Sequence, residues 1–152
     1  MSIVILYGTE SGNAELVADD LVESIDDHPA EAFDMSDFDP ADLDVSDFVI
    51  VVCSTYGDGE LPSGAVPFHD ALTAQQPDLT GLRYAVFGMG DSSYEATYSR
   101  GSEIIDGQLT ALGAVRVGEY GRHDASGRTS ASEAALAWSA QVLELVDGVV
   151  TA

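Results

Sequence analysis

Apolar residues concentrate in three short runs, and each run is followed by a segment rich in glycine, hydroxyl and acidic side chains. The runs span residues 3–7, 47–53 and 82–87, and they are largely β-branched or otherwise apolar, without regular alternation. Apolar runs of this length are typical of parallel strands that are buried on both faces of a sheet. The pattern therefore predicts three central strands, each ending in a glycine-rich loop.

Weaker signals complete the predicted fold. Residues 30–35 and 114–118 are expected to form two further short strands, and residues 119–127 a polar loop. Four segments show apolar residues at helical spacing: 14–22, 64–75, 98–112 and 129–146. Because strands alternate with helices, we expect an α/β fold with a parallel sheet and right-handed crossovers. The length predicts a single domain, residues 1–152.

The sequence also predicts where several individual apolar residues lie relative to the core. Cys53 lies inside an apolar run and is expected to be a small core residue. Trp138, in the last predicted helix, is expected in the core or at the edge of the domain. Residues 36–46 form an acidic connection, which Phe38, Leu43 and Val45 are expected to anchor to the core.

The charge balance is extreme. Twenty-seven aspartates and glutamates face five arginines and no lysine, which gives a formal net charge of -22. Such a surface repels nucleic acid and anionic lipid, so neither is expected as a partner, and the charge favours a monomer. A folded protein with a strongly acidic, hydrated surface indicates a halophilic source. No apolar stretch has membrane-spanning length and no basic leader is present, so we expect a cytoplasmic protein.

The segment after the first run favours binding of a phosphate. Thr9, Ser11 and Asn13 offer polar side chains where a predicted strand passes into a helix N-terminus, which is a common anion site. A nucleoside-triphosphate P-loop is excluded because the chain has no lysine, and the glycines do not form the dinucleotide-binding pattern. The alternative is that Ser11 or Asn13 only caps the helix.

The other two loops share one pattern, in which a strand is followed by glycines, an acidic residue and a tyrosine. Tyr56 follows the second run and Tyr94 the third. Because the carboxyl ends of parallel strands lie along one edge of the sheet, all three loops are expected to line one pocket there. The residues thus predict a phosphorylated, planar ligand held between aromatic rings.

These three loops, in this order and spacing, resemble those of the flavodoxin family. The nearest groups are the FMN domain of diflavin reductases, such as cytochrome P450 reductase and sulfite reductase, and short stand-alone MioC-like flavodoxins. The resemblance covers essentially the whole chain. It implies a three-layer sandwich with a five-stranded parallel sheet of order 2-1-3-4-5 and helices on both faces, with FMN as the cofactor.

The resemblance also implies which residues contact FMN. One loop would hold the phosphate, the two tyrosines would enclose the isoalloxazine ring, and glycine backbone and acidic residues would approach its edge. Tyr98 is included although many members of the family have Asn or Cys there. The expected cofactor-binding residues are Thr9, Glu10, Ser11, Gly12, Asn13, Ala14, Ser54, Thr55, Tyr56, Gly57, Asp58, Gly59, Gly88, Met89, Gly90, Asp91, Tyr94, Tyr98 and Asp124. No catalytic residue and no metal ligand are expected.

The implied function is an electron carrier that shuttles electrons one at a time between a reductase and an acceptor protein, both with basic docking patches. The 152 residues contain no separate NAD(P)H or FAD domain, so electrons are expected to come from a partner. A flavodoxin-like quinone or nitro reductase is an alternative, but two tyrosines covering the ring would block hydride transfer to it. A flavin-free interaction scaffold is another. A phosphoacceptor receiver domain is excluded because its acidic pair and its lysine are missing.

Overall fold

Strands and helices alternate along the chain in the structure, which is a computed structural model. It describes residues 2–8, 13–25, 29–54, 64–90, 100–117, 121–124 and 131–151. The strands in these ranges are β1 (Ile3–Gly8), β2 (Ala30–Asp34), β3 (Phe48–Ser54), β4 (Arg83–Gly90), β5 (Val115–Arg116) and β6 (Gly121–Asp124). The helices are α1 (Asn13–Ser24), the 3₁₀ helix η1 (Pro40–Asp42), α2 (Val66–Gln75), α3 (Arg100–Ala111) and α4 (Ala131–Thr151).

The sheet has the predicted order, β2-β1-β3-β4-β5, and its described strand pairs are all parallel. The predicted fold class is therefore confirmed. One prediction about its edge was wrong, because β6 falls inside the expected polar loop, residues 119–127. Strand β3 occupies one side of β4, so β5 and β6 follow each other along the other side. The register against β4 shifts by two residues between them.

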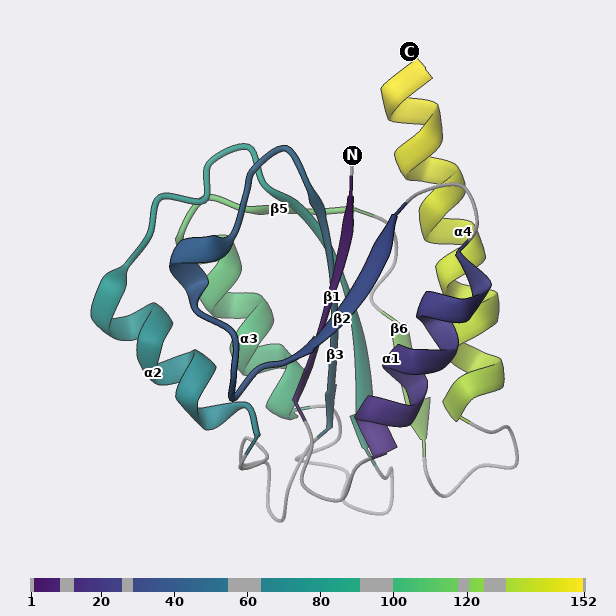
Figure 1. Cartoon of the computed structure of the whole chain (residues 1–152), viewed down its shortest axis with the longest axis horizontal. Helices are drawn as coiled ribbons and strands as arrows, with labels where there is room; N and C mark the ends of the chain where they lie inside the picture. The colour runs from purple at the N-terminus through teal and green to yellow at the C-terminus, as the bar shows by residue number, and fades with distance from the viewer. Residues whose placement is uncertain are drawn as a thin grey trace.

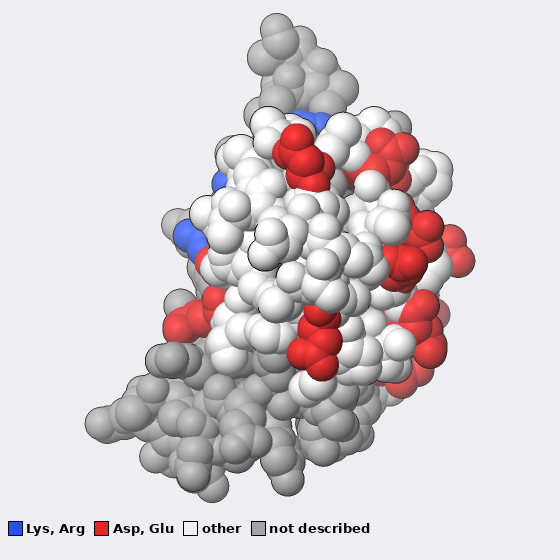
Figure 2. Space-filling view, turned by 90° about the vertical axis from the view of Figure 1, so that its left-hand side faces the viewer, with Lys and Arg blue, Asp and Glu red and all other residues white. Residues whose placement is uncertain are grey.

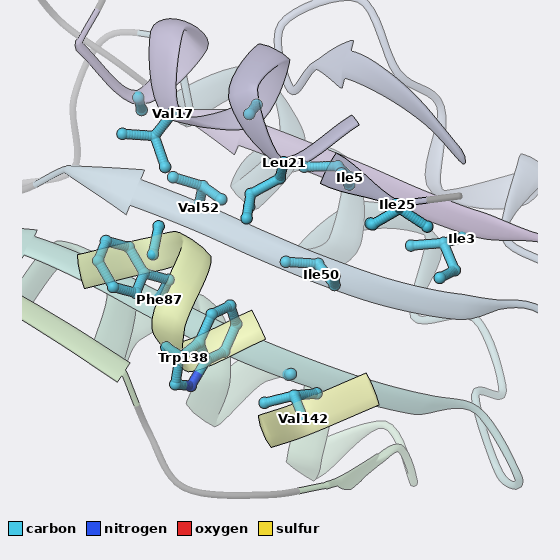
Figure 3. Close-up of a cluster of buried hydrophobic side chains, with 14 of the residues drawn as sticks. Ile3, Ile5, Val17, Leu21, Ile25, Ile50, Val52, Phe87, Trp138 and Val142 are labelled. Carbon is cyan, nitrogen blue, oxygen red and sulfur yellow. The ribbon is translucent and has the colours of Figure 1, made fainter. Parts of the chain in front are cut away.

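Two hydrophobic layers hold the helices against the sheet. Helices α1 and α4 cover one face and α2 and α3 the other, as Figure 1 shows. Strand β3 contributes to both layers, because alternate side chains point to opposite faces. Phe48, Ile50 and Val52 lie in the layer of α1 and α4. Figure 3 shows Ile50 and Val52 in this layer. Val49, Val51 and Cys53 lie in the other layer. Burial on both faces explains why this run lacks polar residues.

Helix α1 shows how the helical pattern becomes packing. Ala14, Val17, Ala18 and Leu21 are buried against the sheet, at the spacing of one helix face. Leu16, on the other face, is 63% exposed. Across the same layer, the rings of Phe87 and Trp138 lie 5.4 Å apart between centroids, which confirms the expected core position of the tryptophan (Figure 3).

The acidic connection is held by apolar anchors and by its own aspartates. Phe38 packs against Phe68 of α2, with ring centroids 6.3 Å apart, and Leu43 joins the same layer. The expectation for Val45 was wrong, because its side chain is 47% exposed. Asp39 accepts a hydrogen bond from the backbone N–H of Ala41, so part of the negative charge also shapes the turns. Figure 2 shows acidic residues spread over the face that carries α2.

Candidate functional site

The carboxyl ends of the central strands form one continuous edge of the sheet. Gly8 of β1 is in register with Cys53 of β3, Cys53 with Gly88 of β4, and Gly88 with Arg122 of β6. All these strands run in the same direction, and their carboxyl ends lie at the lower edge in Figure 1. Open parallel sheets bind ligands just outside such an edge. The segments that follow β1, β3 and β4 therefore start side by side.

The predicted site residues fall partly on this edge. Gly88, Met89 and Gly90 were expected to open a loop, but they form the last residues of β4. Ser54 is the last residue of β3 and is in register with Met89. Predicted contact residues in the segments that follow β1, β3 and β4 lie outside the described residues. They are Thr9, Glu10, Ser11, Gly12, Thr55, Tyr56, Gly57, Asp58, Gly59, Asp91, Tyr94 and Tyr98.

Strand β6 places Asp124 at the same edge. Asp124 is the last residue of β6 and is in register with Gly90, the last residue of β4. Sequence reasoning put it in a polar loop, because its four-residue strand Gly-Arg-His-Asp has no apolar pattern. This segment is a strand because its backbone pairs with β4, and an apolar pattern in the sequence does not show that pairing. The backbone of Asp124 therefore lies beside the end of β4, at the same edge of the sheet.

The first turn of α1 lies beside the end of β1. The helix begins at Asn13, and the side chain of Ala14 is completely buried in the layer between α1 and the sheet. This packing holds the helix N-terminus at the carboxyl edge, where free backbone N–H groups and the helix dipole favour an anion. Because its side chain is buried, Ala14 can contact a ligand only through its backbone.

Close packing at Gly8 keeps the end of β1 in place, a role that sequence reasoning did not assign. A Cβ atom at Gly8 would lie 2.7 Å from the Cβ of Ala65 and 2.9 Å from the sulfur of Met35. Both contacts are too short for a real side chain. Ala65 precedes α2 and Met35 follows β2. No local pattern reveals this contact, because the three segments are distant in sequence.

The described residues of this edge include a cysteine but no candidate metal centre. Cys53 is completely buried, and burial raises the pKa of its thiol to about 12, so it stays protonated at neutral pH. Among the residues that the structure describes, no group of three or more His, Cys, Asp or Glu side chains could hold a metal ion. No helix in the same part of the chain is long and apolar enough to cross a membrane.

Comparison with known proteins identifies the family. The flavodoxin family model matches residues 5–138. The sulfite reductase flavoprotein alpha-component of Vibrio cholerae is 35% identical over 98% of this chain, which covers 24% of that protein. NADPH–cytochrome P450 reductase of Cavia porcellus is 35% identical over 83% of the chain, which covers 20% of that reductase. The chain thus spans about a quarter or less of the curated relatives it matches.

Solved structures of single-domain size match over nearly the whole chain. A mutant of flavodoxin from Pseudomonas aeruginosa superposes with a TM-score of 0.83 and is 33% identical, covering 95% of this chain and 99% of that one. Flavodoxin 2 from Bacillus cereus gives a TM-score of 0.81 at 33% identity, with the same coverage.

The donor set and the edge geometry fit FMN. A helix N-terminus suits a phosphate monoester, as do the neutral donors that the sequence offers at Thr9, Ser11 and Asn13. Glycines end two of the strands at this edge, Gly8 in β1 and Gly90 in β4. The family model, the relatives and the sheet order all agree with this cofactor. The chain belongs to the flavodoxin family, with FMN as its cofactor.

Proposed function

We propose that this protein is an electron carrier with no catalytic residue of its own, and that it passes electrons one at a time between a reductase and an acceptor protein. The supporting observation is the edge at which β1, β3, β4 and β6 end within two residues of one another in the sheet register. When bound there, FMN supplies the redox chemistry. The chain itself binds the cofactor, orients it and sets the charge around it.

In this proposal each segment at the edge has a separate task. Residues Thr9–Ala14 bind the phosphate through hydroxyl, amide and backbone N–H donors. Tyr56 and Tyr94 cover the two sides of the ring. Each such aromatic contact contributes roughly 0.5–1.5 kcal/mol beyond the burial of its area. The remaining contacts come from backbone and acidic groups at the ring edge: Gly57, Gly59, Met89, Gly90, Asp91 and Asp124.

The surface charge limits the partners in this proposal. With a net charge of -22, the protein is drawn to partners with basic patches and repels nucleic acid, anionic membranes and its own copies. We therefore propose a monomeric, cytoplasmic carrier from a halophilic source, with residues 1–152 forming one FMN domain. Two reductases among the relatives match the chain over a part of their length, which supports an electron donor of that class.

Titration with FMN and riboflavin in high salt tests the proposal. Flavin fluorescence should be strongly quenched on binding if tyrosines stack on the ring, and FMN should bind much more tightly than riboflavin if the phosphate loop contributes. Tyr56→Leu and Tyr94→Leu should weaken the quenching of both flavins, whereas Ser11→Ala should weaken FMN binding alone. Absence of quenching in the folded protein would contradict the carrier function and support a flavin-free scaffold.

A further inference from the structure

Space, rather than backbone conformation, requires a glycine at position 8. Its φ angle is not positive; in the described part of the chain the positive values occur at Gln76, Gly81 and Gly113. Any residue could therefore adopt the backbone of Gly8, but a Cβ atom there would lie 2.7 Å from the Cβ of Ala65 and 3.4 Å from its Cα. A glycine within a strand often marks the close approach of another backbone. Here that backbone is the start of α2.

Ala65 shows the same requirement from the other side of the contact. It is the N-cap residue of α2, and its side chain makes no capping hydrogen bond. Alanine is a poor residue at this position, where Ser, Thr, Asn or Asp would stabilise the helix. Ala65 is completely buried, so a larger capping side chain would displace the end of β1. Both residues are thus smaller than their local secondary structure would favour.

Met35 closes the contact on a third side. Its backbone N–H donates to the carbonyl oxygen of Tyr7 at 2.9 Å, which holds it beside the residue before Gly8. Its side chain is completely buried, and its sulfur lies 2.9 Å from the position of a Cβ at Gly8. A methionine side chain is flexible and can adapt, whereas the Cβ of Ala65 is fixed to the backbone of the α2 N-terminus. A side chain at position 8 must therefore move backbone.

This contact lies at the carboxyl edge of the sheet. Gly8 ends β1 in the row that also holds Cys53 and Gly88, and α2 begins at the same edge (Figure 1). The chain enters the segment after β1 at Gly8, and it leaves the segment after β3 shortly before Ala65. In the proposed function these two segments bind the phosphate and one side of the ring. The contact fixes how far apart their described ends lie.

We propose that Gly8 and Ala65 are positioning residues for FMN, because their close approach sets the spacing of the two segments that bind it. Ordinary carbon–carbon contacts are about 3.5–4.0 Å, so a Cβ at Gly8 forces the ends of β1 and α2 apart by more than about 0.5 Å. Binding groups must be held within about 0.5 Å of their productive positions. One added methyl group therefore weakens FMN binding. The inference rests on the proposed roles of the two segments.

The test adds a methyl group on one side of the contact and removes one from the other. Gly8→Ala should raise the dissociation constant for FMN at least about tenfold. In the Gly8→Ala/Ala65→Gly double variant this constant should return to within about threefold of the wild type, and Ala65→Gly alone completes the double-mutant cycle. Dissociation constants are measured by quenching of flavin fluorescence in high salt, and folding is checked by circular dichroism.

Gly113→Ala is the matched control for a loss of stability. A Cβ at Gly113 would lie 2.7 Å from the hydroxyl oxygen of Thr80, and its φ of 103° disfavours any side chain. Gly113 precedes β5, whose Val115 is in register with Arg83 at the start of β4, so it lies at the amino edge of the sheet. Like Gly8→Ala, this variant should lower the thermal midpoint of unfolding. Its FMN dissociation constant should stay within about threefold of the wild type, because the altered site is remote from the carboxyl edge.

Three results would overturn the inference. They are wild-type FMN affinity in folded Gly8→Ala, an equal loss of affinity in Gly113→Ala, and a double variant that does not fold or still binds FMN weakly. If Gly8→Ala does not fold, Ala65→Val is measured in its place, because it adds two carbon atoms to the same buried contact. The double variant decides in either case.

The failure of this inference and that of the proposed function give different results. If the wild type binds no flavin in high salt, the proposed function is wrong and this inference fails with it. If the wild type binds FMN and folded Gly8→Ala binds it equally well, the proposed function stands and only the positioning role of the contact is refuted.

Discussion

At the scale of single residues, Tyr84 links the sheet to α3. Its ring is completely buried, and its hydroxyl donates to the carboxylate of Asp106 at 2.6 Å, with the hydroxyl of Thr110 2.7 Å away. The other oxygen of Asp106 accepts from Arg116 of β5. One carboxylate thus ties β4, α3 and the edge strand together. Burial raises the pKa of Tyr84 to about 12, and the hydrogen bond to Asp106 acts in the same direction.

This pKa predicts a loss of stability at high pH. An unfolded tyrosine ionises near pH 10, so between about pH 10 and 12 the unfolded chain releases a proton that folded Tyr84 keeps, and the free energy of unfolding falls by about 2–3 kcal/mol. Below pH 10 that contribution is fully present. The Tyr84→Phe variant should be about 1 kcal/mol less stable than the wild type near neutral pH. Its free energy of unfolding should fall less than that of the wild type when the pH is raised. Urea unfolding at about pH 8 and about pH 11 measures the free energy of unfolding of each protein. If this free energy falls equally in the variant and the wild type, the raised pKa of Tyr84 is refuted.

At the scale of elements, the strands should differ in how readily they open without unfolding of the whole protein. Strand β3 pairs with β1 and β4 on its two sides, and the side chains of residues 48–53 are buried. Strand β5 has two residues, pairs with β4, and exposes 58% of Val115. In hydrogen exchange, amides of β3 should exchange only with global unfolding, whereas those of β5 should exchange at least about a hundredfold faster through local opening. Equal protection of both strands would contradict this picture.

At the scale of the whole molecule, self-repulsion should make stability depend on salt. A net charge of -22 on 152 residues destabilises the compact state, and added ions screen it. We expect the thermal midpoint to rise by roughly 10 °C between low salt and about 2 M KCl, corresponding to a few kcal/mol in a domain of this size. The rise should be steepest at low salt, where screening changes most.

Two denaturants separate screening from other effects of salt. Guanidinium chloride is an electrolyte, so its lowest concentrations should raise the stability of this protein before denaturation sets in. Urea is uncharged and should lower stability from the first addition. If low guanidinium chloride and low urea destabilise the protein alike, self-repulsion is not an important term in its stability.

The central strands could be predicted from the sequence, whereas an edge strand and one anchor residue could not. The three central strands were predicted, and Cys53 was placed in the core, because burial on both faces demands continuous apolar runs. Trp138 was expected in the core or at the edge of the domain because it lies in a segment of helical spacing, and it is buried. Strand β6 was missed, since an edge strand in a polar segment carries no such run. Val45 was placed wrongly, because its side chain is exposed, whereas Phe38 and Leu43 pack against the core.

The sequence by itself determined the fold class, the order of the elements other than β6, and the family, because these follow from apolar periodicity and from loop motifs that are contiguous in the chain. The tertiary structure decided which residues meet. It paired Asp124 with Gly90, and it packed Met35 and Ala65 against Gly8. These contacts join segments far apart in sequence, and they depend on strand register and helix placement, which no local pattern encodes.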